Sequence, residues 1–104
     1  MDGDLDVFGD GSVRVLSSPG HTPGHCSLLV RLGGTGPVVL SADVAHYGFN
    51  LEHRCVPTMN SNAEESQSSM ERIESLARGE DAQLWLNHDI VQTATIPHAP
   101  SYFD

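Results

Sequence analysis

The segment Ser18-Pro-Gly-His-Thr-Pro-Gly-His25 decides how the rest of this sequence is interpreted. Such a segment is a loop, because glycine permits unusual backbone angles and proline fixes φ and lacks an N–H donor. It lies between two runs whose composition predicts strands, 13–16 and 27–32. The two histidines of the loop, His21 and His25, therefore lie near strand ends, where the residues of functional sites are often found.

Outward from this loop, the sequence predicts an α+β fold with one main helix. Strands are expected at 13–16, 27–32, 38–40 and 83–86. A Gly- and Pro-rich turn at 33–37 indicates that the strands on either side of it form a hairpin or meander, not a parallel crossover. A helix is expected to begin after Ser61 or Asn62, which can cap it, and to stop at Gly79. Residues 44–60 are expected to form an irregular loop that carries function.

Composition limits the classes of function. The chain has 14 Asp and Glu residues against 5 Lys and Arg residues, a formal net charge of −9. Nucleic acids and anionic membranes are bound by clustered cations, so neither is an expected partner. Cys26 and Cys55 are too few for a disulfide framework and are interpreted as free thiols. No apolar run reaches the length of a membrane span and no signal-peptide pattern is present, which favours a cytoplasmic location.

Polar clusters follow three of the expected strands, at 21–25, at 43 and at 88–89. Imidazole nitrogens and carboxylates are the ligands of catalytic zinc, and a carboxylate can bridge two metal ions. Positions at strand ends would allow His21, Asp43 and His88 to meet. The spacing is also compatible with simpler interpretations, in which the histidines belong to turns and the aspartate caps one.

The three clusters, in this order and with a helix before the last, resemble the metallo-β-lactamase superfamily. Within it, the sequence is most similar to the N-acyl homoserine lactone lactonases, because three further segments match: Asp-Val-Phe-Gly-Asp-Gly at 6–11, Val-Pro-x-x-Asn at 56–60 and Gln-Leu-Trp-x-x-His-Asp at 83–89. The resemblance covers nearly the whole chain. It implies half of an αββα sandwich, with an antiparallel or mixed sheet and one main helix, and it implies that residues 1–104 form the C-terminal part of the domain.

The same resemblance implies a metal site. His21, Asp43 and His88 match ligands of the family, and Asp43 matches the carboxylate that bridges the two zinc ions of a complete enzyme. His25 and Asp89 match positions beside the ligands, from which a side chain orients the site without binding the metal. The resemblance therefore predicts three ligands and two supporting residues in this chain.

A further comparison concerns catalysis. The best-known lactonases carry a tyrosine three residues after the bridging aspartate, where it helps to polarise the lactone carbonyl. His46 stands at that position here and Tyr47 follows it. Asp43, His46 and Tyr47 are therefore the predicted catalytic residues, and either of the latter two could donate the hydrogen bond.

The implied activity is zinc-dependent, quorum-quenching hydrolysis of an N-acyl homoserine lactone or a related ester, by attack of a hydroxide that bridges the two metals. The superfamily's H-x-H-x-D-H motif does not occur in these 104 residues. We therefore expect this fragment to bind metal weakly, to be inactive alone and to require the N-terminal half of the fold. An apolar sheet face left uncovered would favour a homodimer.

Two alternatives remain open at this stage. One is a non-catalytic relic or interaction module that keeps the fold without the chemistry. The other is a thioesterase of the glyoxalase II type on the same scaffold.

Overall fold

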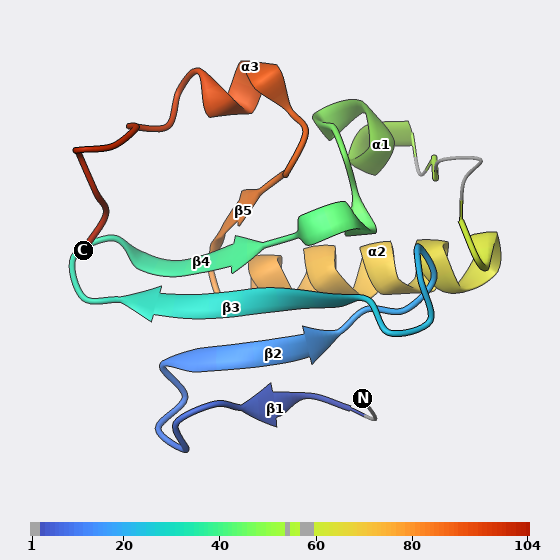
Figure 1. The fold of residues 1–104 in the computed structure, drawn as a ribbon, viewed down its shortest axis with the longest axis horizontal. Helices are drawn as coiled ribbons and strands as arrows, with labels where there is room; N and C mark the ends of the chain where they lie inside the picture. The colour runs from blue at the N-terminus through green and yellow to red at the C-terminus, as the bar shows by residue number, and fades with distance from the viewer. Residues whose placement is uncertain (1–2, 54, 57–59) are drawn as a thin grey trace.

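The computed structural model describes residues 3–53, 55–56 and 60–104 as one sheet with helices around it (Figure 1). The elements in chain order are β1 (Leu5–Asp6), β2 (Val13–Ser17), β3 (Cys26–Leu32), β4 (Gly36–Leu40), the 3-10 helix η1 (Ala42–Val44), α1 (Gly48–His53), α2 (Ala63–Gly79), β5 (Gln83–Trp85) and α3 (Ile90–Thr93). The strands are ordered β1-β2-β3-β4-β5, and α2 lies along one face of the sheet. The predicted α+β class with one main helix is confirmed.

The sheet is mixed. Strands β1 to β4 pair antiparallel, and the register places Ser17 opposite Cys26 and Leu32 opposite Gly36. The expected β3–β4 hairpin is therefore confirmed. Strand β5 pairs parallel with β4, because the long connection through α2 returns the chain to the same end of the sheet.

The core lies between the sheet and α2. Leu16, Leu29 and Val39 point toward the helix from three adjacent strands and are fully buried, and Met70 and Ile73 meet them from α2. Side chains alternate across a strand, so these three residues lie on the face of the sheet that meets α2. Burial of each such side chain stabilises the fold by roughly 1.5–3 kcal/mol, so this layer fixes α2 against the sheet.

Helix α2 begins as the sequence predicts. The Asn62 side chain accepts a hydrogen bond of 3.0 Å from the Glu65 amide, which satisfies one of the free N–H groups of the first turn. At the other end, Gly79 is the last helical residue, but the left-handed residue that redirects the chain is Asp81, with φ of 54°. The expected stop at Gly79 is therefore confirmed, and the chain changes direction two residues later.

Two elements were not expected. The N-terminal strand β1 pairs with β2, and α1 occupies part of the segment expected to be an irregular loop. The short helix α3 follows β5 in the terminal segment.

Of the Val-Pro-x-x-Asn match, positions 57–59 lie outside the described residues. Both cysteines are free thiols, as expected. Among the described residues, no helix is long and apolar enough to span a membrane.

Candidate metal centre

The histidine-bearing loop is the turn of the β2–β3 hairpin. Its base is closed by the Ser18 amide, which donates to the His25 carbonyl at 3.0 Å. Gly20, with φ of 136°, lies so close to α2 that a Cβ there would be 2.3 Å from the Ser66 amide nitrogen. Only glycine permits this approach. The carbonyl of His21 then accepts from the Ser61 amide at 3.2 Å, which fixes His21 beside the start of α2.

Asp43 lies where β4 passes into η1. The residue before it, Ala42, has a φ of 50°, and Asp43 itself has φ of −95° and ψ of 19°. A residue with a Cβ in the left-handed region costs roughly 1–3 kcal/mol, and such strain persists only where the surroundings hold it. The turn directs the Asp43 carboxylate toward the histidines of the neighbouring loops.

Three imidazoles surround the Asp43 carboxylate. The Nε2 atom of His88 lies 2.9 Å from Oδ1 of Asp43, and Nε2 of His46 lies 3.5 Å from the same oxygen. Nε2 of His21 lies 3.6 Å from the other oxygen, Oδ2. The two carboxylate oxygens therefore face different histidines, as a bridging carboxylate would.

Electrostatics favour the forms of these groups that bind metal. Burial would raise the pKa of Asp43, but the hydrogen bond from His88 and the charges of the neighbouring histidines together lower it below its usual value. Burial, and then repulsion from His88, lowers the pKa of His46 despite the opposing effect of Asp43. An ionised carboxylate and a neutral imidazole are the ligand forms required.

The residues present fit a metal ion. Ligand atoms of Asp43, His46 and His88 all lie within 4.8 Å of one another. Two buried imidazole nitrogens, Nδ1 of His21 and Nε2 of His46, have no hydrogen-bond partner among the described residues. A buried polar atom without a partner is costly. A cation bound by His46 Nε2 and by the Asp43 carboxylate would give that nitrogen a partner.

The structure brings together the three predicted ligands, and it adds His46, which the sequence indicated only as a catalytic residue. The imidazole of His46 lies 4.6 Å from that of His88 and 5.8 Å from that of His21, measured between ring centroids. The signal that could have identified His46 is its place three residues after Asp43, on the turn that follows β4. The ligand roles themselves remain predictions.

The two predicted supporting residues take different positions. Nε2 of His25 accepts from the Asp43 amide at 2.9 Å, so His25 contacts the backbone of the candidate ligand. Asp89 caps α3 and accepts from the Gly48 amide at 2.8 Å, which joins α3 to α1 and lowers the pKa of Asp89. Tyr47 is exposed, with its ring centroid 6.3 Å from that of His46.

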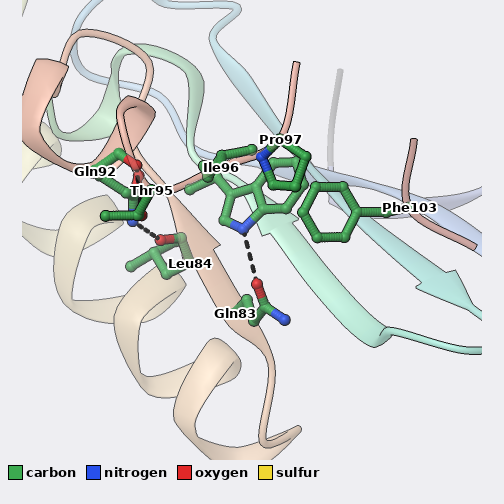
Figure 2. Close-up of a pocket in the computed structure, with 8 residues that line it drawn as sticks. Gln83, Leu84, Gln92, Thr95, Ile96, Pro97 and Phe103 are labelled. Carbon is green, nitrogen blue, oxygen red and sulfur yellow. Dashed lines mark hydrogen bonds between the residues drawn. The ribbon is translucent and has the colours of Figure 1, made fainter. Parts of the chain in front are cut away.

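A separate pocket lies between β5 and the C-terminal segment (Figure 2). It has a volume of about 350 Å³ and is lined by both polar and apolar side chains, with Ile96, Pro97 and Phe103 among the apolar ones. The rings of Trp85 and Phe103 are 4.8 Å apart. None of the clustered histidines lines it, so the pocket and the polar cluster are distinct features.

The chain shares its fold with solved metal-dependent hydrolases. A probable metal-dependent hydrolase from Staphylococcus aureus is similar in fold, with a TM-score of 0.70, 16% identity and 86% of this chain covered. A solved N-acyl homoserine lactone hydrolase, with N-hexanoyl-L-homoserine bound at its catalytic metal centre, superposes with a TM-score of 0.87 at 31% identity. That superposition covers 98% of this chain and 40% of the hydrolase.

Curated relatives are similar in sequence. The N-acyl homoserine lactonase AttM of Azorhizobium caulinodans is 33% identical over 104 residues, all of this chain and 40% of the relative. The N-acyl homoserine lactonase of a Bacillus species is 34% identical over 98% of this chain and 40% of its own length. No family model matches. The resemblance to the N-acyl homoserine lactonases is confirmed, and the chain spans about two fifths of the relatives it matches.

Proposed function

We propose that this chain is part of a metal-dependent hydrolase that opens N-acyl homoserine lactones. The observation that carries the proposal is the Asp43 carboxylate, whose two oxygens face His88 and His21 at 2.9 and 3.6 Å. The lactonase relatives support the substrate class, since they are similar over the whole of this chain. The chain would supply the C-terminal part of the domain.

Asp43, His46 and His88 would hold one side of a zinc site, and His21 would hold the other side of the shared carboxylate. A bound zinc ion supplies a Lewis acid and lowers the pKa of water, the chemistry that ester and lactone hydrolysis needs. Three protein ligands are the minimum for a catalytic zinc. Because the ligands here are shared between two positions, two full sites require residues from the remainder of the domain.

The residues of this chain would also orient the substrate. Tyr47 is exposed beside His46, and its phenol could donate a hydrogen bond to the lactone carbonyl. The Asp89–Gly48 hydrogen bond would hold the segment that carries His46 and Tyr47 against α3.

A cytoplasmic location remains a prediction.

A chimera tests the proposed activity. This chain replaces the matching 40% of the A. caulinodans lactonase, and opening of N-hexanoyl homoserine lactone is followed as acid release. We expect zinc-dependent ring opening, and we expect Asp43→Asn in the same chimera to abolish it. A folded, zinc-loaded chimera that hydrolyses a thioester but no lactone would instead support the thioesterase alternative. One that hydrolyses neither would support the non-catalytic module.

A further inference from the structure

His25 has both ring nitrogens engaged in hydrogen bonds. Its Nε2 lies 2.9 Å from the amide nitrogen of Asp43. An amide N–H can only donate, so Nε2 must be the unprotonated nitrogen and Nδ1 must carry the proton. Nδ1 lies 2.9 Å from both the carbonyl oxygen and the hydroxyl of Ser18, which can accept that proton. The surroundings therefore assign one tautomer to His25.

Two buried serines extend this arrangement across the sheet. Ser18 and Ser27 are each 1% exposed, and their hydroxyls lie 3.0 Å apart. The Ser27 hydroxyl donates to the Ser41 carbonyl at 2.9 Å, so it must accept from Ser18. The Ser18 hydroxyl then accepts from His25. Every hydroxyl proton has one acceptor, and the chain of bonds joins the ends of β2, β3 and β4.

We propose that His25 is a positioning residue for Asp43, and that Ser18 and Ser27 hold it in the tautomer this requires. By accepting from the Asp43 amide, His25 secures the strained turn at Ala42. The turn in turn sets the carboxylate between the surrounding histidines. The hydrogen bonds of His25, Ser18 and Ser27 do not depend on a metal, whereas their effect on metal binding rests on the proposed function.

The competing explanation is that His25 only closes the hairpin loop. The loop already has a backbone bond of its own, from the Ser18 amide to the His25 carbonyl, which any residue at position 25 retains. A structural role alone would lower stability and leave zinc affinity unchanged in a variant that folds. The two explanations therefore differ in whether the loss of His25 weakens zinc binding.

The first experiment titrates the full chain with zinc in competition with a chromophoric chelator. Outer-shell partners are typically worth roughly 10–100-fold in metal affinity, and we expect His25→Ala to weaken zinc binding within that range. His25→Gln can still accept from the Asp43 amide, so it should regain most of the affinity. Ser27→Ala should lie between the two. The control is His98→Gln, an exposed histidine whose Nε2 lies 3.1 Å from the Thr93 carbonyl, and it should bind as the wild type does.

The second experiment uses NMR on the metal-free chain. We expect the His25 proton on Nδ1, and protection of the Asp43 amide from exchange that is lost in His25→Ala and kept in His25→Gln. Equal Asp43 protection in both variants, or unchanged zinc affinity in His25→Ala, would overturn the proposal. If the wild type takes up no zinc, the proposed function fails while the NMR result still decides the positioning role. If His25→Ala does not fold, His25→Gln and Ser27→Ala decide it.

Discussion

At the scale of single residues, Asp43 unites the features of the candidate site. It follows a buried strand, lies on a strained turn, and faces histidines from three different segments of the chain. Carboxylates placed this way serve as metal ligands or as partners of protonated histidines. Nε2 of His46 has no hydrogen-bond partner among the described residues, which favours a metal over an ion pair beside Asp43.

Replacing Asp43 with asparagine separates these interpretations. The variant keeps the amide bonded to His25 and removes only the negative charge. We expect zinc affinity to fall by more than the roughly 10–100-fold that the loss of an outer-shell partner costs. Chelator competition measures the change. The control is Asp10→Asn, whose carboxylate accepts from the Ser12 amide in an exposed turn. Equal zinc affinity in both variants would contradict the assignment.

His46 provides a second prediction at this scale. Its Nε2 is buried, unpartnered among the described residues and 3.5 Å from Asp43. If it is a ligand, His46→Ala should weaken zinc binding about as much as His88→Ala does. If it acts only on substrate, the variant should bind zinc normally. Titration of both variants distinguishes a ligand from a catalytic donor.

At the scale of elements, the contact between the hairpin loop and α2 positions His21. Gly20 lies against the Ser66 backbone and has a positive φ. The close contact and the backbone angle each exclude a side chain there. Gly20→Ala should therefore destabilise the fold by about 2 kcal/mol or more. Gly24→Ala is the matched control, since a Cβ there meets nothing within 4 Å. Urea unfolding of the two variants measures the difference, and equal midpoints would contradict the described contact.

The cap of α2 gives another prediction for an element. Asn62→Ala removes the bond to the Glu65 amide and should cost about 1 kcal/mol. Ser61→Ala is the control, because Ser61 contributes its backbone amide to the contact with His21. Thermal unfolding followed by circular dichroism compares them. A smaller loss for Asn62→Ala than for Ser61→Ala would mean that the cap does not form.

The larger elements could be predicted from sequence because their signals are local. Alternating and apolar runs identify β2 and β3, and Asn62 marks the start of α2. Helix α1 has no such signal. It begins at Gly48, and it depends on the Asp89 carboxylate, 41 positions away in the sequence. Strand β1 is likewise a two-residue element whose existence depends on pairing with β2.

For the site, the sequence and the resemblance indicated His21, Asp43 and His88. The structure places the two histidines beside the Asp43 carboxylate. The position of His46, three residues after Asp43, placed it near the site, but its distance from the carboxylate depends on the path of the chain after η1. The hydrogen bond from the Asp43 amide to His25 is equally non-local, because its partners are 18 positions apart. Residue types indicate the chemistry, and only tertiary structure decides which of them meet.

At the scale of the whole molecule, one face of the sheet carries α2 and the opposite face is only partly covered. Leu28 and Leu40 pair across β3 and β4 and are half-buried on this second face. We expect the isolated chain to form a homodimer through it, because exposed apolar patches associate. Sedimentation across a range of concentrations measures the mass, and Leu28→Glu should shift it to the monomer. A wild-type monomer at every concentration would contradict this prediction.

Anomalous diffraction from zinc-soaked crystals of the chain shows whether Asp43 and its histidines form a metal centre. We expect an anomalous peak in contact with Asp43 and at least one of His46 and His88, with the direct His88–Asp43 hydrogen bond replaced by contacts to the ion. Zinc bound elsewhere, with that hydrogen bond intact, would mean that these residues do not form a metal centre.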